Sequence, residues 1–102
     1  MDKADTPAPH YKGHRDRLRQ RFVTGGENAL ADYELLELLL FQAIPRKDVK
    51  PLAKSLIAKF GSYANVLNAP LHQLSGFDGL SETSAIAIKS VQAAAHRLMK
   101  QD

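Results

Sequence analysis

The segment from Leu35 to Ile44 is apolar at eight of its ten positions, and these positions fall in every quadrant of a helical wheel. Asp32 stands before the segment as a helix N-cap, and Pro45 ends it. A helix that is apolar on all sides must be buried on all sides. The segment is therefore either the central helix of the domain or a helix partly buried against another subunit or a neighbouring domain.

The length and composition bound what surrounds this helix. A chain of 102 residues has room for one hydrophobic core but not for a deep cleft. The absence of cysteine excludes disulfides, thiolate zinc sites and thiol nucleophiles. The longest apolar run, Leu38 to Phe41, is far too short to cross a bilayer, and the first residues show no secretory pattern. We expect a soluble, cytoplasmic protein without a membrane partner.

Helical periodicity and capping residues place further helices along the chain. Residues 1–11 have nothing to bury and are expected to form a disordered tail, so that the domain spans 12–102. Asp48, Ser62 and Ser81 are the expected N-caps. Because no alternating run of strand type reaches four residues, the fold class is all-α, with five or six short helices. The predicted helical segments are 14–24, 32–44, 48–60, 62–67, 69–74 and 81–100.

Charge is arranged in blocks. Residues 10–26 and 45–60 each carry +4, while residues 27–44 between them carry −4. Two basic segments can lie on one face of the domain and bind an anionic partner. In the first, four arginines border an apolar stripe of Leu18 and Phe22, either as basic rails or as solvated groups whose stems cover the edge of the core. These arginines are Arg15, Arg17, Arg19 and Arg21.

A glycine turn before the last helix resembles the helix-hairpin-helix DNA-binding motif. That motif usually reads Gly-apolar-Gly with a small residue four positions later, and Gly79, Leu80 and Ala85 match it, whereas Ser81 stands at the second glycine. The turn lets backbone N–H groups at the start of the second helix point at a phosphate, and the helix dipole supports the contact. Serine is small enough to permit this approach, though less freely than glycine.

A second turn of the same kind precedes it in the chain. Residues 59–66 can be laid over residues 79–86, which pairs Phe60 with Leu80. Two such hairpins related by a pseudo-twofold would straddle the minor groove and hold a phosphate on each strand. The alternative is that both turns are helix C-caps that connect packed helices and bind nothing.

Three further motifs make a family resemblance specific: His14-Arg15-x-Arg17-Leu18-x-x-Arg21-Phe22, the run 32–40, and the run 44–53 from Ile44-Pro45-Arg46 to Leu52-Ala53. With the two hairpins they resemble the N-terminal domain of the bacterial RadC family (UPF0758) over nearly the whole chain after Lys12. The resemblance implies a tandem helix-hairpin-helix domain of SAM or HhH2-like type in proteins named for DNA repair. It also implies a second half, a JAB/MPN-type metal-dependent hydrolase-like domain with a Glu and a His-x-His ligand set, which this sequence does not contain.

Catalytic alternatives fit poorly. His10 and His14 have helical metal-ligand spacing, but no glutamate lies between them. A glycosylase-type aspartate would have to be Asp102, at the end of the chain. A Schiff-base lyase needs a desolvated lysine, and the pattern places Lys54, Lys59 and Lys89 on polar faces. We expect no enzyme activity, no metal and no cofactor in this chain.

The sequence therefore predicts a non-catalytic, sequence-nonspecific module that grips the phosphates of duplex or branched DNA through backbone amides at 61–63 and 80–83. The alternative is a protein-interaction or dimerisation module, which would use the leucines of 35–44 to bind a second copy or the hydrolase domain. A third possibility is a rigid structural lead to that domain. The predicted DNA-binding residues are Lys59, Gly61, Ser62, Tyr63, Gly79, Leu80, Ser81, Glu82, Lys89, Arg46 and Lys47.

Overall fold

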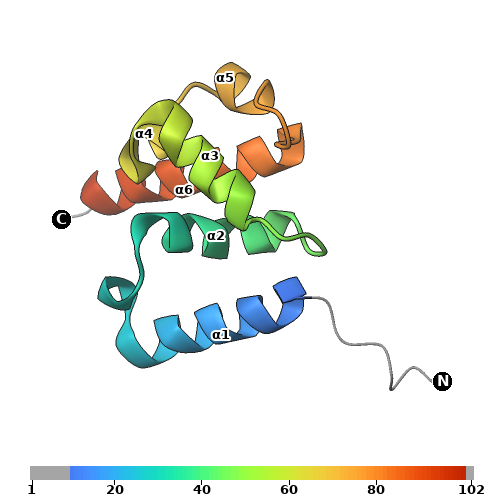
Figure 1. Cartoon of the computed structure of the whole chain (residues 1–102). Coiled ribbons are helices and arrows are strands. Elements are labelled where there is room, and N and C mark those ends of the chain that lie inside the picture. Colours follow the sequence, from blue (N-terminus) through green and yellow to red (C-terminus); the bar gives the residue numbers. More distant parts are fainter. Residues whose placement is uncertain (1–9, 101–102) are drawn as a thin grey trace.

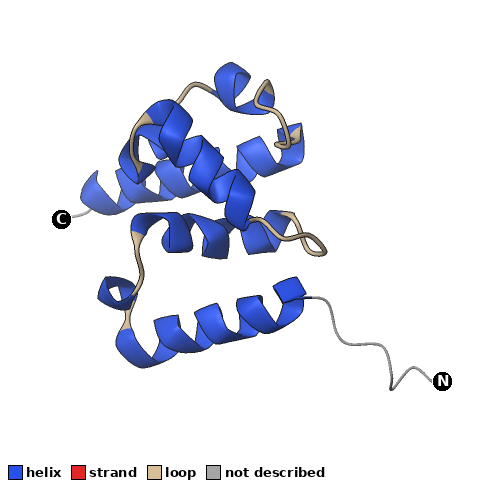
Figure 2. Cartoon of the chain, viewed as in Figure 1, coloured by secondary structure: helices blue, strands red, loops and turns tan. Residues whose placement is uncertain are grey.

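The structure, a computed structural model, describes residues 10–100, and Figure 1 shows the order of the helices. Figure 2 shows helices joined by short loops, and no strand occurs between residues 10 and 100, so the predicted all-α class is confirmed. Residues 1–9 of the predicted tail lie outside the described residues, and the first helix already begins at His10. The elements are α1 (His10–Gly25), η2 (Glu27–Ala29), α2 (Asp32–Ala43), α3 (Lys50–Phe60), α4 (Tyr63–Asn68), α5 (Leu71–Ser75) and α6 (Glu82–Lys100).

Serine residues cap two of the helices, as predicted. The amide of Asn65 donates to Ser62 Oγ at 3.0 Å at the start of α4, and the amide of Ser84 donates to Ser81 Oγ at 3.1 Å at the start of α6. Each hydroxyl satisfies one of the amides that have no partner within their own helix. These two bonds fix where α4 and α6 begin.

The two predicted aspartate caps are each displaced by one position. Ala31, not Asp32, is the N-cap of α2, because the Glu34 carboxylate reaches back and accepts the Ala31 amide at 2.9 Å. Val49 is the residue preceding α3, while Asp48 Oδ1 accepts the amide of Lys50 at 3.0 Å. Asp48 still satisfies an amide of the first turn, so the local chemistry was predicted and the boundary was not.

Helix α2 lies at the centre of the domain. It packs on α1 along one side and on α3, α4 and α6 along the other (Figure 1). The central-helix alternative is therefore the correct one within the described part of the chain. The buried apolar core draws on every α-helix: Leu18, Leu36, Leu39, Leu40, Phe41, Ala53, Leu56, Val66, Leu74, Ala85 and Ile88.

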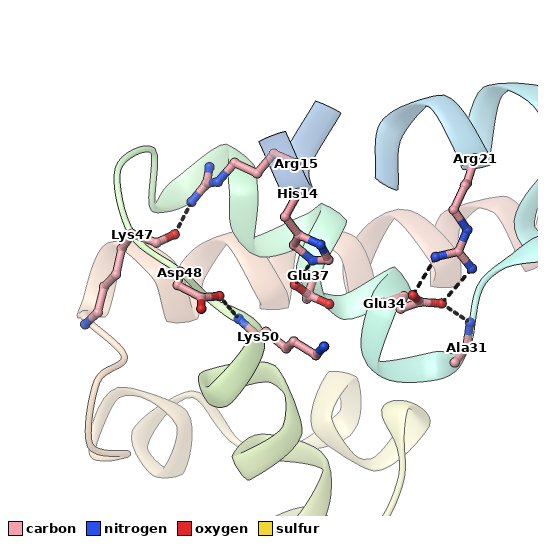
Figure 3. A network of polar contacts seen from close by, with 9 residues as sticks. All are labelled: His14, Arg15, Arg21, Ala31, Glu34, Glu37, Lys47, Asp48 and Lys50. Atoms are coloured by element: carbon pink, nitrogen blue, oxygen red, sulfur yellow. Dashed lines mark hydrogen bonds and ion pairs between the residues drawn. The ribbon is translucent and has the colours of Figure 1, made fainter. Parts of the chain in front are cut away.

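Polar side chains take part in the attachment of α1 to α2. Glu37 is fully buried, and its Oε1 lies 2.8 Å from His14 Nε2 (Figure 3). Leu18 is buried, but Phe22, predicted to lie in the same stripe, is 41% exposed. The apolar contact between the two helices is therefore narrow, and the His14–Glu37 pair adds a polar contact to it.

Arg15 fits neither alternative drawn from the sequence for the arginines. Its side chain is buried, and its guanidinium donates to the carbonyl oxygens of Phe41 at 3.2 Å and Ile44. It also donates to the carbonyl of Lys47 at 2.7 Å (Figure 3). These carbonyls end α2 and begin the loop that follows, where a helix leaves acceptors without partners. Arg15 therefore fixes the course of the loop between α2 and α3.

Arg21 is also bound within the domain. It donates to both carboxylate oxygens of Glu34, at 2.7 and 3.1 Å (Figure 3). It also donates to the carbonyl of Ala29 at 2.9 Å. The hydrogen bond and positive charge of Arg21 hold the pKa of Glu34 below its ordinary value, against the opposing effect of partial burial. This pair joins the end of α1 to the start of α2.

Candidate nucleic-acid interface

The turn before α6 contains a glycine in the left-handed conformation. Gly79 has φ +90°, in the left-handed region that favours glycine. The side chain of Leu80 is buried, whereas residues 81–83 are exposed. The amide of Ala85 makes the first backbone bond of the helix, to the carbonyl of Ser81 at 2.9 Å. Amides ahead of it therefore face outward unless the turn uses them.

The set of outward amides is smaller than predicted. At the second turn, the amide of Leu80 donates to the carbonyl of Phe77 at 3.0 Å, so only the amides of residues 81–83 are left of the predicted phosphate-binding set 80–83. At the first turn, the amide of Gly61 donates to the carbonyl of Ile57 at 2.7 Å, so only the amides of residues 62 and 63 are left of the predicted set 61–63. Both losses have one cause, because a glycine turn uses its own early amides to close the helix or loop before it.

The first turn ends α3 and begins a much shorter helix. Gly61 has φ +103° and is the left-handed C-cap of α3. Asn65 Nδ2 donates to the carbonyl of Phe60 at 2.8 Å and so also satisfies the end of α3. Because α4 has six residues, its dipole is small. The side chain of Tyr63 is half-buried, and burial raises the pKa of its hydroxyl.

The predicted overlay of the two turns is out of register by one residue. It paired Gly61 with Ser81, but the two N-caps are Ser62 and Ser81. The left-handed glycine directly precedes the N-cap in the first turn and stands two positions before it in the second. The turns are therefore related in chemistry but differ in length, which the sequence alone could not show because both contain only one glycine.

The two turns lie toward opposite ends of α3 (Figure 1). A Cβ atom at Gly79 would be 3.5 Å from Leu52, near the start of α3, and Gly61 follows its last residue. Leu52 and Gly61 are nine positions apart, which corresponds to about 13 Å along the axis of α3.

Lys59, Arg46 and Lys47 are exposed, as a contact with an anion requires. Lys47 and Gly79 line the same groove of about 370 Å³ between the α2–α3 loop and the second turn. Lys59 lies at the other end of α3, beside a pocket of about 560 Å³ that Phe77 also lines. The structure thus places one predicted cation near the second turn and another near the first.

Two further features of the second turn depart from the prediction. Asp78 and Glu82 flank it, and their negative charge opposes a phosphate. Lys89, predicted to lie on a polar face and to reach DNA, instead turns inward, where its ammonium donates to the carbonyls of Leu67 at 3.0 Å and Ala69 at 2.8 Å. A lysine two turns into a helix meets these carbonyls only because α4 ends beside α6, a contact that no local pattern encodes.

A basic groove that the sequence did not single out lies between α1 and the α2–α3 loop. It has a volume of about 400 Å³ and is lined by Lys12, Arg15, Asp16, Arg19, Phe41, Pro45 and Arg46. The available signal was the pair of +4 charge blocks, because this groove is where residues from both blocks meet.

A metal-ligand group and a membrane-spanning helix are both missing from residues 10–100. No three histidine, aspartate or glutamate side chains in this range are grouped so that they could hold a metal ion. None of the helices in the same range combines the length and apolar character needed to cross a membrane.

Together these features define a small all-α domain with two serine-capped helix starts and a basic groove. The chain belongs to the UPF0758 family: the model of the family's N-terminal region matches residues 12–86, which confirms the resemblance drawn from the motifs. A UPF0758 protein of Ruegeria pomeroyi is 50% identical over 93 residues, which cover 90% of this chain and 42% of the relative. The chain thus spans about two fifths of that relative's length. No solved structure matches the chain.

Proposed function

We propose that this chain is a non-catalytic module that binds DNA through its phosphates without reading sequence. The observation that carries the proposal is the turn Gly79–Ser81, which leads into the exposed residues Glu82 and Thr83 at the start of a 19-residue helix, where their amides have no acceptor within the helix. Outward amides at the positive end of a helix dipole favour a phosphate. Such contacts position a protein on DNA but carry no base information.

Charge decides how strong this binding is. Asp78 and Glu82 weaken the hold of the amides on a phosphate, so Lys47 and Lys59 supply most of the favourable electrostatic energy. The two lysines neutralise about two phosphates, which gives a salt dependence with a slope of about −2, because the backbone amides of the turns carry no net charge. The expected dissociation constant lies in the range of about 10⁻⁴ to 10⁻⁶ M that is typical of nonspecific binding.

The proposal extends to the longer members of the family. The resemblance drawn from the motifs implies a hydrolase-like second half, and we place any hydrolytic activity and the catalytic part of a role in DNA repair there and not in the domain described above. The domain described above would then hold DNA, duplex or branched, for that second portion.

A pair of substitutions at Glu82 isolates the amide contact. Glu82→Pro removes both the N–H group and the carboxylate, and proline is well tolerated at the first position of a helix. Glu82→Gln removes only the charge and is the matched control. In a duplex titration at low salt we expect Glu82→Gln to bind more tightly than the wild type, and Glu82→Pro to bind about tenfold more weakly than Glu82→Gln. Equal affinity of the two folded variants would show that the turn is only a connector.

A specific observation also supports a protein-interaction function. The leucines of 35–44, expected to form such a surface, are taken up by the core, but Leu98 and Met99 near the end of α6 are 73% and 81% exposed. Light scattering tests this alternative. A chain that self-associates and binds no DNA at low salt would replace the DNA-binding proposal with an interaction module.

A further inference from the structure

The basic groove between α1 and the α2–α3 loop has more positive charge than the domain itself uses. Four cations line it against one carboxylate, Asp16. Arg15 donates hydrogen bonds to the loop carbonyls. Arg19 Nη1 lies 3.4 Å from Asp16 Oδ1, in an exposed ion pair that contributes little to stability. Lys12 and Arg46 are exposed and have no hydrogen-bond or ion-pair partner among residues 10–100. The groove therefore favours an anion with several charges.

The floor of the groove is flat and partly apolar. The Phe41 ring is buried beneath two guanidinium groups, with Arg15 Cζ 4.5 Å and Arg19 Cζ 5.4 Å from its centroid. Pro45 completes the lining. An exposed guanidinium held over a ring offers its other face to a planar ligand, and nucleic-acid bases stack on arginine in this way.

Consecutive residues of the α2–α3 loop connect the groove with the proposed DNA contact. Arg46 lines this groove, and its neighbour Lys47 lines the adjacent groove that reaches Gly79. Because Arg15 holds the Lys47 carbonyl at 2.7 Å, the segment that carries both cations is fixed in place before a ligand arrives. Arg15 thus acts as a positioning residue for the two cations.

We propose that this groove binds an unpaired strand of nucleic acid, with phosphates at Lys12 and Arg46 and a base stacked on Arg19. A groove of about 400 Å³ is the size of a small-ligand site and too small to admit a duplex. The inference rests on the proposed function and deepens it. The turns hold duplex phosphates, the groove holds the strand that leaves the duplex, and the preferred DNA has a junction between paired and unpaired regions.

The charge contacts are tested with a single-stranded oligonucleotide of ten thymidines. The double variant Lys12→Gln, Arg46→Gln removes two cations without known partners, so its thermal stability should equal that of the wild type. We expect its affinity to fall at least fivefold at low salt and its salt slope to decrease by about 1.4, at about 0.7 for each phosphate on a single strand. The control with the same charge change, Arg97→Gln, Lys100→Gln at the far end of α6, should keep the wild-type slope.

The stacking contact is tested with Arg19→Lys, which keeps the charge and removes the planar group. The wild type should bind ten thymidines more tightly than an abasic strand of equal length, and Arg19→Lys should bind both equally. Unchanged single-strand affinity in the folded Lys12, Arg46 variant would overturn the site, and equal binding of polyglutamate would overturn the assignment to nucleic acid.

The same variants separate this inference from the proposed function. If Glu82→Pro and Glu82→Gln bind duplex equally while the Lys12, Arg46 variant loses single-strand binding, the single-strand site in the groove is supported and the duplex contact at the turn is refuted. If Glu82→Pro binds duplex more weakly than Glu82→Gln while the Lys12, Arg46 variant keeps its single-strand affinity, the site in the groove is refuted and the contact at the turn is supported.

Discussion

Replacing Lys89 with methionine tests the inward course of its side chain. The ammonium donates to the carbonyls of Leu67 and Ala69, at the point where α4 ends and the chain leads into α5. Methionine keeps the apolar stem and removes the charged donor. The substitution therefore reports on these two hydrogen bonds and leaves the packing of α6 in place.

The magnitude follows from the two bonds. A hydrogen bond from a charged donor contributes about 1.5 to 3 kcal/mol, and two bonds from one half-buried ammonium are not additive. Ala69 is buried, so its carbonyl loses its donor in a site with little access to water. We expect Lys89→Met to lower the free energy of unfolding by about 2 kcal/mol, which corresponds to a decrease in Tm of about 8 to 16 °C for a domain of this size.

Thermal and urea unfolding followed by circular dichroism measure this change. Lys59→Met, an exposed lysine on α3, is the control and should stay within about 0.5 kcal/mol of the wild type. A duplex titration adds a second readout, because an ammonium bound inside the domain should leave the salt slope unchanged when it is removed. A Lys89→Met variant as stable as Lys59→Met, or one whose slope falls by about 1, would refute the inward contact.

Two more predictions concern stability. Ser81→Gly should lower the free energy of unfolding by about 1 to 2 kcal/mol. This is more than replacing a cap with glycine usually costs, because Ser81 Oγ also donates to the buried hydroxyl of Ser84 at 3.1 Å. A loss of only a few tenths of a kcal/mol in urea unfolding would contradict this prediction. Arg21→Gln should destabilise the domain near neutral pH and progressively less in acid. Because the pKa of Glu34 is lowered in the folded state, the pair stabilises the fold above the unfolded-state pKa, and this stabilisation is lost as the pH falls through the folded-state pKa. A difference in unfolding free energy between variant and wild type that stays constant from about pH 6 to 3 would argue against the pair.

Local chemistry explains which features could be predicted. Ser62, Ser81 and Gly61 act through neighbours within four residues, so their roles as caps and turn residues follow from the sequence pattern. The central position of α2 follows from apolar residues on every face, which leave burial as the only stable arrangement.

The misplaced residues are charged side chains with distant partners. A helical wheel assigns Arg15 and Lys89 to the water-facing side, because it cannot show that carbonyls at the ends of other helices lie within their reach. Arg15 meets Phe41 and Lys47 from 26 and 32 residues away, and Lys89 meets Ala69 from 20 residues away. Such contacts depend on how helices pack, as does the meeting of two basic segments in one groove.

The docking of α1 on α2 also bears on how the domain opens. Helix α1 packs on η2 and α2, its neighbours in the chain, whereas α6 packs on α2, α4 and α5. Because the other helices pack on one another without α1, its detachment leaves their packing in place, and we infer that α1 can undock while the rest of the domain stays folded. While it is detached, Glu37 faces water and regains its hydration, which offsets part of the lost contacts and makes α1 a unit that opens by itself. The basic groove exists only while α1 is docked, so a bound strand would draw the domain toward its closed state by mass action.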